Sequence, residues 1–444
     1  MADPTKRVIA ISERLYRWLL GAYPPNFRRR YAAPMTQVFL DCCRAAYRRG
    51  GTRSVLRLWL PTLGDLIANA IAEHFSTLIQ LLRGQIARFN LHAFPMLQRQ
   101  GGTMLHITNG DSVGITLRQT GLPGDILTWR DILHEGPTPA GLSLEQMSQV
   151  RAQFLAGQTL GALGTYEDVL ADFIQRDATL VHSNTHKEVV LWFEHDLYDQ
   201  LQLIQLLDWF SRHNHRATNI SLICINTFPG ITNFVGLGQL NASQLRSLYE
   251  TRHSLTKKEL ALGSEAWKAY CSPDPKVLEA FLQKDISALP FLKAALQRHL
   301  EQFPALQAGL SRTERQILEV VASGSHKPIE IFRATQEKEE SPFLGDTPFW
   351  FYLSNLCSGK KPFLKRADGG NFSLPKADPH DPAFNEQVLI LTDEGRNALS
   401  GQADWITINR GIDRWLGGVH LQGHDAAWRW DTQQATLIQV QGAV

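Results

Sequence analysis

Short apolar runs alternate with polar loops and helical stretches between residues 104 and 240. The apolar runs span residues 105–108, 126–129, 189–193 and 220–225. The run 189–193 is apolar throughout, as is typical of a parallel strand buried on both faces. Helical stretches follow the first and third runs, and a strand, a tight glycine turn and a helix begin a βαβ unit. The pattern therefore predicts the α/β fold class, with a Rossmann-like parallel sheet over 104–240.

The rest of the chain predicts further domains on either side of this sheet. Residues 241–308 have the leucine spacing of a helical segment, and the Gly- and Trp-rich residues 402–444 indicate a C-terminal β-hairpin segment. Residues 309–401 predict a winged-helix-like domain. Its first helix starts at the capping box of Ser311 and Glu314, and Gly369 and Gly370 interrupt a predicted strand–wing–strand.

The charge on the predicted third helix of the winged-helix-like domain bears on DNA binding. This helix covers residues 347–357, and there is no Lys or Arg between Asp346 and Ser358. A helix that reads base edges usually carries Arg, Lys, Asn or Gln. Only a basic wing over 360–366 is placed to contact phosphates, so DNA is an open but not a favoured partner.

The first hundred residues differ from the remainder in charge. Residues 1–100 contain 15 Lys and Arg against 5 Asp and Glu, a net charge of +10, whereas the other 344 residues have a net charge of −8. Apolar spacing predicts a basic module of three helices, the first with Leu15, Leu19, Leu20 and Tyr23 on one face. The arginines at 28–30 and 48–49 indicate contact with an anionic membrane surface, a nucleic acid or another protein, or else a solvated helix face.

Composition excludes several classes of protein. No apolar run reaches the roughly 18 residues needed to span a bilayer, so we expect no transmembrane segment. Arg14 and Arg17 interrupt the N-terminal apolar stretch, which argues against a secretory signal. The five cysteines include no CxxC pair, which favours the reducing cytoplasm.

Each of the four predicted strands ends in polar residues, and ligands of open α/β sheets bind beyond the strand carboxyl ends. We therefore expect these residues to line one cleft. The candidate catalytic residues are Asp111, Ser112, His134 and His195. The candidate ligand-binding residues are His106, Asn109, Gly110, Arg130, Asp131, Glu135, Glu194, Asp196 and Asn226.

Two of these groups have several chemical interpretations. Gly110, Asp111 and Ser112 resemble the nucleophile block of SGNH-type ester hydrolases, but the partner blocks of that class are absent. The same residues suit anion binding at a helix start or simple N-capping. Arg130 beside Asp131 suits a bidentate clamp on a carboxylate or phosphate, or a buried ion pair that holds the loop.

The histidine–carboxylate groups also leave alternatives open. His134 with Glu135, and His195 with Glu194 and Asp196, suit a divalent metal ion, metal-free acid–base chemistry or a structural polar network. None of the strong metal-ligand spacings occurs, so the sequence assigns no metal ligands, and the identity of any cofactor stays unknown.

Three motifs carry a resemblance to a known family. Residues 105–112, 129–137 and 191–200 together resemble the bacterial DUF1835 family, a domain of unknown function, and the likeness extends from about 104 to 444. Separately, Arg14-Leu15-Tyr16, Tyr23-Pro24, Phe27-Arg28 and Tyr31 resemble the cytoplasmic prefix of certain bacterial orphan permeases. That prefix normally precedes transmembrane helices, and no such helices follow here.

The expected function is therefore binding of a small anionic ligand, a nucleotide or another phosphate or carboxylate compound, at the carboxyl edge of the sheet. Hydrolysis or group transfer would be the accompanying reaction, and whether the protein is an enzyme stays open. The alternative is a transcription regulator that senses a ligand and binds DNA through its winged helix. A scaffold without a ligand is the third interpretation.

Overall fold

The computed structural model describes residues 4–22, scattered positions from 36 to 59, and residues 104–440 apart from short gaps at 159, 161–162, 214–216, 377–380 and 424–427. The chain divides into two compact units, Met1–Gln98 and Arg99–Val444. Of the three helices predicted in the first unit, only the first lies largely within the described residues.

In the first unit, α1 (Pro4–Leu19) is followed by a short 3-10 turn, η1 (Leu20–Ala22). Ser12 and Tyr16 of α1 and Leu20 of η1 are buried, and Tyr16 stacks on Phe39 with ring centroids 4.1 Å apart. The predicted apolar face was therefore wrong for Leu15, which is 44% exposed. The arginines at 28–30 and 48–49 lie outside the described residues, as does most of the two later helices predicted in this unit.

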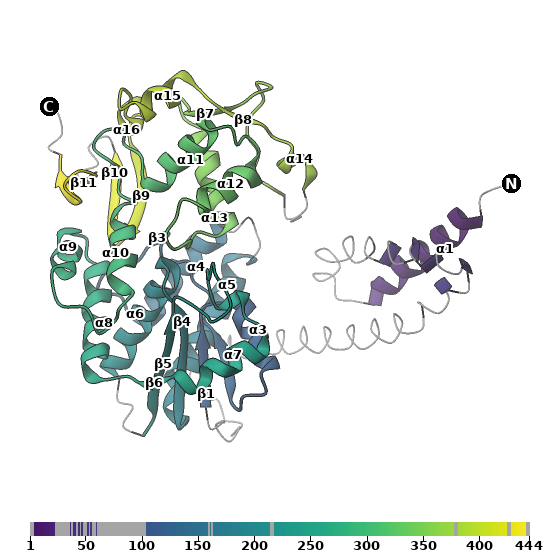
Figure 1. The fold of residues 1–444 in the computed structure, drawn as a ribbon, viewed down its shortest axis with the longest axis horizontal. Helices are drawn as coiled ribbons and strands as arrows, with labels where there is room; N and C mark the ends of the chain where they lie inside the picture. Colours follow the sequence, from purple (N-terminus) through teal and green to yellow (C-terminus); the bar gives the residue numbers. More distant parts are fainter. Residues whose placement is uncertain are drawn as a thin grey trace. The chain divides into compact units, whose positions relative to one another are not determined.

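The second unit contains the predicted parallel sheet (Figure 1). Its strand order is β2-β1-β4-β5-β6, and all neighbours are parallel except the short β6, which is antiparallel to β5. The strands are β1 (Met104–Thr108), β2 (Asp125–Thr128), β4 (Glu188–Glu194), β5 (Asn219–Ile225) and β6 (His253–Ser254). The α/β class with a parallel sheet is thus confirmed.

Helices cover both faces of this sheet. Side chains alternate between the two faces along each strand, so β4 and β5 each contribute apolar residues to two clusters. Leu105, Ile107 and Leu191 pack in one cluster with α6 (Leu197–Arg212) and α8 (Lys257–Tyr270). Val190 and Trp192 pack in a second cluster with α3 (Asp111–Gln119) and α7 (Ala242–Leu248). The helix that follows β1 and the helix that follows β4 therefore lie on opposite faces.

This arrangement makes the boundary between β1 and β4 a topological switch point. The chain leaves β1 through α3 to reach β2 on one side, whereas β4 and its helix α6 lie on the other side. In open α/β sheets, the connections diverge at such a point and leave a crevice at the carboxyl ends of the two strands.

Two helices that the sequence pattern did not predict lie between β2 and β4. They are α4 (Leu144–Gln158) and α5 (Tyr166–Val181), and they pack on each other through Leu155 and Phe173. The 3-10 turn η2 (His182–Thr185) leads from α5 into β4. The buried face of α4 includes Ser148 and Arg151 beside Met147, Ala152 and Leu155, so its sequence carries little apolar helical periodicity.

The elements after β5 are mostly helical. The 3-10 turns η3 (Leu237–Gln239) and η4 (Tyr249–Thr251) flank α7, and α9 (Lys276–Leu282) and α10 (Leu292–Leu300) follow α8. Three helices come next, α11 (Arg312–Ala322), α12 (Pro328–Gln336) and α13 (Asp346–Leu356). Strands β7 (Leu364–Arg366) and β8 (Leu389–Leu391) then pair antiparallel. Short helices α14 (Pro382–Asn385), α15 (Asp393–Leu399) and α16 (Trp405–Asn409) complete this part.

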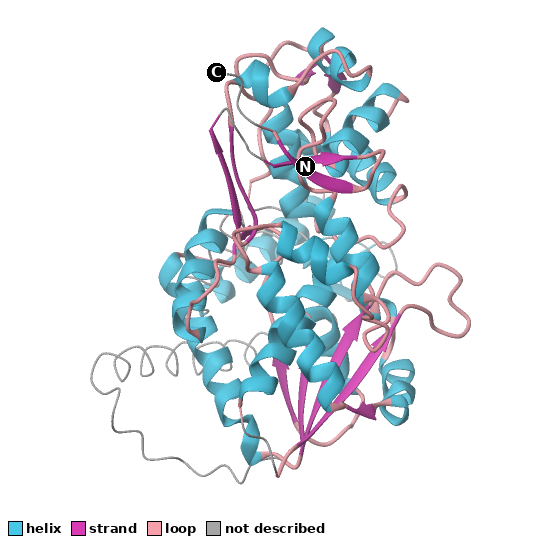
Figure 2. Ribbon diagram, turned by 90° about the vertical axis from the view of Figure 1, so that its left-hand side faces the viewer, coloured by secondary structure: helices cyan, strands magenta, loops and turns pink. Residues whose placement is uncertain are grey.

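The C-terminal segment forms two hairpins, β9 (Ile412–Gly417) with β10 (Val419–Gly423) and β11 (Trp428–Asp431) with β12 (Thr436–Gln439). Strand β9 also pairs with β3 (Gly136–Pro137), in the loop that follows β2. Figure 2 shows the first hairpin as a long ribbon running between the sheet and the C-terminal helices. Among the described residues, no helix is long and apolar enough to cross a membrane.

Candidate functional site

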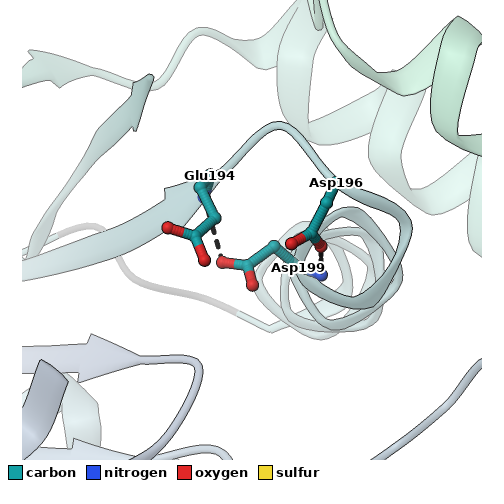
Figure 3. Close-up of side chains that lie close together, drawn as sticks. All are labelled: Glu194, Asp196 and Asp199. Carbon is teal, nitrogen blue, oxygen red and sulfur yellow. Dashed lines mark hydrogen bonds between the residues drawn. The ribbon is translucent and has the colours of Figure 1, made fainter. Parts of the chain in front are cut away.

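Three buried carboxylates gather at the carboxyl end of β4, at the switch point. Glu194 is the last residue of β4, Asp196 is the N-cap of α6, and Asp199 lies in the first turn of that helix. One oxygen from each side chain lies within 4.8 Å of the others. Figure 3 shows the Asp199 carboxylate between the other two side chains. We call these three residues the acidic cluster.

Local hydrogen bonds explain why the acidic cluster forms here. Asp196 accepts a 2.9 Å hydrogen bond from the backbone N–H of Asp199, which satisfies a free donor of the first helical turn. Asp199 accepts a 3.0 Å bond from the Glu194 backbone N–H. The strand end and the helix start therefore hold each other, and the tight connection brings all three carboxylates together.

Asn109 joins the end of β1 to the acidic cluster. Its Nδ2 donates to Asp199 Oδ2 at 2.8 Å and to Glu194 Oε1 at 3.3 Å. The Tyr198 hydroxyl donates to the Asn109 carbonyl at 3.1 Å. These bonds hold the ends of β1 and β4 together across the switch point.

The loop before η3 closes the other side of the acidic cluster. The backbone N–H of Leu237 donates to Glu194 Oε2. A Cβ on Gly236 would lie 2.4 Å from Glu194 Oε1, so this position accepts only glycine while the carboxylate stays in place.

Burial and mutual repulsion disfavour negative charge in the acidic cluster. Desolvation raises the pKa of Glu194 to about 8, and the neighbouring Asp196 charge adds to this effect. Desolvation raises the pKa of Asp196 to about 7. The pKa of Asp199 is raised well above its usual value by burial and by the charges of Glu194 and Asp196. In the described part of the chain, no Lys, Arg or His forms an ion pair with any of the three.

Arg130, a predicted ligand-binding residue, forms ion pairs with two carboxylates of the protein. Arg130 donates to both oxygens of Asp111, with its Nε at 2.9 and 2.8 Å, and to both oxygens of Asp172 on α5 at 2.9 Å. Since its donors already face carboxylates, Arg130 is engaged by two acids and is not an open anion clamp. Hydrogen bonding to Asp111 raises the pKa of Arg130.

The ion pair predicted for Asp131 forms with a different arginine. Arg151 of α4 donates to Asp131 Oδ1 at 2.7 Å, and both side chains are fully buried. Arg151 also donates to the carbonyls of Ile132 and Glu135. Asp131 therefore holds the loop after β2 and does not face a ligand.

The structure matches neither the capping nor the nucleophile interpretation of Gly110, Asp111 and Ser112. Gly110 is the N-cap of α3, and no side chain caps this helix. Ser112 is exposed, and within the described residues no histidine hydrogen-bonds its hydroxyl. A serine nucleophile needs such a base, so the ester-hydrolase arrangement is not assembled.

The three candidate histidines, His106, His134 and His195, contact different sets of neighbours. His106 accepts a 3.1 Å hydrogen bond from Trp192 Nε1, and its Nε2 lies 3.1 Å from the carbonyl oxygen of Pro123, which precedes β2. His106 lies in the middle of β1, and its ring packs against Trp192 and Tyr249 on the face of the sheet that α3 and α7 cover, so it does not reach the loops at the carboxyl edge. The prediction that His106 lines the cleft is therefore wrong. Burial lowers its pKa.

His134 and His195 do not bond the acidic cluster. The His134 ring is buried edge-on to Tyr198 and Phe343, and desolvation lowers its pKa to about 3. The His195 ring packs near Phe234 and Phe291, and desolvation lowers its pKa. Both imidazoles are therefore neutral at pH 7.

Within the described residues, no hydrogen bond joins Glu135 or Asn226 to the acidic cluster. Glu135 accepts a hydrogen bond of 2.5 Å from the hydroxyl of Tyr352 on α13, and desolvation raises its pKa. Asn226, after β5, is exposed. Of the predicted ligand-binding residues, Asn109, Glu194 and Asp196 are those that meet.

Asp199 is the member of the cluster that the sequence interpretation did not assign to the site. Its spacing, three residues after Asp196 and five after Glu194, fits a first-turn helix charge equally well. Only the tight connection between β4 and α6 brings its carboxylate next to Glu194.

Comparison with known proteins adds no assignment. No protein-family model matches the chain, and no curated protein matches its sequence. The function is therefore argued from the site alone.

Proposed function

We propose that this protein binds a divalent cation at the acidic cluster and, through that cation, a small anionic ligand such as a nucleotide or another phosphate or carboxylate compound. The observation that carries the proposal is the position of three buried carboxylates, with which no Lys, Arg or His of the described residues forms an ion pair, at the switch point between β1 and β4. Ligands of open α/β sheets bind at such points.

A cation resolves the electrostatic conflict in the acidic cluster. Buried charges are normally paired or coordinate metals, and burial without a cation raises the pKa of Glu194 to about 8 and that of Asp196 to about 7. Carboxylate oxygens, with the Asn109 side chain beside them, are the hard donors that Mg²⁺, Mn²⁺ and Ca²⁺ prefer. We therefore expect a hard divalent ion at the acidic cluster.

The same cation would allow an anionic ligand to bind next to three carboxylates, because its positive charge would lie between them. Magnesium sites commonly use one or two carboxylates together with the phosphates of a substrate. Helices α3 and α6 both begin at this edge, and their N-termini favour negative charge. A cation that polarises a phosphoryl or acyl oxygen supports hydrolysis or group transfer, the reaction classes that fit this site.

We further propose that the sheet is Rossmann-like and that residues 309–401 form a winged helix with a packing role. In support, Phe349, Trp350 and Tyr352 of α13 are buried, and the Tyr352 hydroxyl bonds Glu135 after β2. The side of α13 that is not buried includes Thr347, Phe351 and Asn355, and the helix carries no Lys or Arg to contact phosphates or base edges. These contacts favour the ligand-binding proposal over the transcription regulator.

Metal titration tests the proposal. Binding of Mn²⁺ to the full chain is followed by electron paramagnetic resonance, which reports free Mn²⁺ directly. Asp196→Asn is the variant of choice, because Asn also caps a helix and so preserves the start of α6. Glu188→Gln, at the opposite end of the same strand, is the matched control.

We expect one Mn²⁺ site in the parent chain and in Glu188→Gln, and an affinity at least about tenfold weaker in Asp196→Asn, since one charged ligand is lost. Equilibrium dialysis with a labelled nucleotide then compares binding with and without Mn²⁺. Absence of saturable Mn²⁺ binding in the parent chain would contradict the cation site. Nucleotide binding that is independent of both metal and Asp196 would place the anionic ligand elsewhere.

A further inference from the structure

One face of α1 is exposed and carries large apolar side chains. Trp18 is 74% exposed and Leu15 is 44% exposed, whereas Ser12 and Tyr16 of the opposite face are buried. Large aromatic side chains dominate core and interface energetics and are seldom left in water to this extent. The exposed face therefore indicates an interaction surface.

Basic residues adjoin this apolar pair. At 3.6 residues per turn, Trp18 lies one turn from both Arg14 and Leu15, so the three side chains are neighbours. Arg14 and Arg17 are both exposed. Arg17 lies at the edge of this face and pairs with Glu13 at 2.9 Å, and an exposed ion pair of this kind is weak enough to be exchanged for a lipid phosphate. We call Arg14, Leu15, Arg17 and Trp18 the α1 surface.

The α1 surface belongs to the basic part of the sequence. Residues 1–100 have a net charge of +10, which favours an anionic partner. The surface of an anionic bilayer is a partner of this charge.

We propose that the α1 surface binds the face of an anionic lipid bilayer. Trp18 and Leu15 enter the boundary between headgroups and acyl chains, and Arg14 and Arg17 contact lipid phosphates. Tryptophan is enriched at this boundary, and basic amphipathic helices with Trp and Leu on their apolar side lie in it. A nucleic acid would use the arginines but would leave Leu15 without an apolar partner.

Vesicle flotation of the full chain tests this proposal. The vesicles contain phosphatidylcholine alone or phosphatidylcholine with phosphatidylglycerol. We expect binding to the mixed vesicles that weakens as salt increases, and little binding to phosphatidylcholine alone, because attraction to anionic lipid is screened by salt.

Two variants separate the apolar and the basic contributions. Leu15→Ala with Trp18→Ala, and Arg14→Glu with Arg17→Glu, should each lower binding at least about tenfold. Both change exposed side chains, and circular dichroism verifies that the helices are retained. The control is Ile115→Ala with Arg118→Glu, an exposed apolar–basic pair on α3, which should leave binding unchanged.

Several results would overturn the proposal. They are equal binding to both kinds of vesicle, no binding to either, or binding that persists in both α1 variants. Binding of DNA or RNA that depends on the arginines but not on Trp18 would assign the surface to a nucleic acid. Self-association that the Trp18 variant abolishes, without vesicle binding, would assign it to a second copy of the chain.

Discussion

Asn109 and Asp199, which are 90 positions apart in the sequence, are joined by a 2.8 Å hydrogen bond from the amide Nδ2 to the carboxylate Oδ2. The same amide nitrogen also donates to Glu194. This contact connects the carboxyl ends of β1 and β4, and it makes the acidic cluster dependent on both strands.

Asn109→Ala should destabilise the protein by about 2–4 kcal/mol, because two hydrogen bonds to acidic groups are lost and the buried carboxylates lose a donor. Urea unfolding followed by circular dichroism measures the change. Asn233→Ala, an exposed position in a loop, is the control and should change stability by less than about 0.5 kcal/mol. An Asn109→Ala variant as stable as the parent would show that the amide is not part of the network.

Stability without added metal should fall as pH rises from about 4 to about 8. The folded pKa values of Glu194 and Asp196, about 8 and about 7, lie above their usual values. In that window the folded state therefore binds more protons than the unfolded state, and the free energy of unfolding decreases with pH.

Thermal melting at pH 5 and at pH 8 measures this slope. Asp196→Asn should flatten it, since the amide does not titrate, and saturating Mn²⁺ should reverse the loss at pH 8 because the ion replaces the protons. An equal slope in the parent and in Asp196→Asn would contradict a titrating acidic cluster.

Gly236→Ala should weaken Mn²⁺ binding without abolishing folding. The added Cβ would lie 2.4 Å from Glu194 Oε1, so either the loop or the carboxylate must move. Gly230→Ala, where no atom lies within 4 Å of the added Cβ but φ is positive, controls for a glycine replacement in the same loop. Unchanged Mn²⁺ affinity in Gly236→Ala would show that the loop yields and the Glu194 carboxylate stays.

Tyr352→Phe should destabilise the chain by about 2–4 kcal/mol. The hydroxyl donates to Glu135 and accepts bonds from Gln302 and Arg414, so its removal costs each of these largely buried groups one hydrogen-bond partner. Tyr166→Phe, at a half-buried tyrosine on α5, is the control in urea unfolding. A similar small effect in both variants would show that Tyr352 does not couple α13 to the loop after β2.

Sequence-selective DNA binding should be absent at physiological salt. Helix α13 carries no Lys or Arg to contact base edges or phosphates, and the few basic residues of the wing, among them Lys361 and Arg366, would neutralise few phosphates. Fluorescence anisotropy with random and selected duplexes measures the affinity. Sub-micromolar selective binding that is lost in Lys361→Glu with Arg366→Glu would support the regulator instead.

The sequence by itself determined the parallel sheet. The apolar run at 189–193 and the helix that starts after Asp196 were correctly predicted, because burial on two faces and helix capping both leave a local pattern. The same local logic predicted polar residues at the strand ends. The apolar face of α1 was misassigned at Leu15, since Leu15 and Tyr16 differ by only one position and only packing selects between them.

Tertiary structure alone decided which polar residues meet. Asp131 pairs with Arg151 and Arg130 with Asp111 and Asp172, although Arg130 and Asp131 are adjacent in the sequence. Asp199 lies next to Glu194 and Asp196, whereas His106 is hydrogen-bonded to Trp192 on one face of the sheet. Strand order and crossover direction determine these distances, and neither leaves a trace in the local spacing of residues. The sequence thus located the edge at which chemistry is expected, and the fold selected the three carboxylates at it.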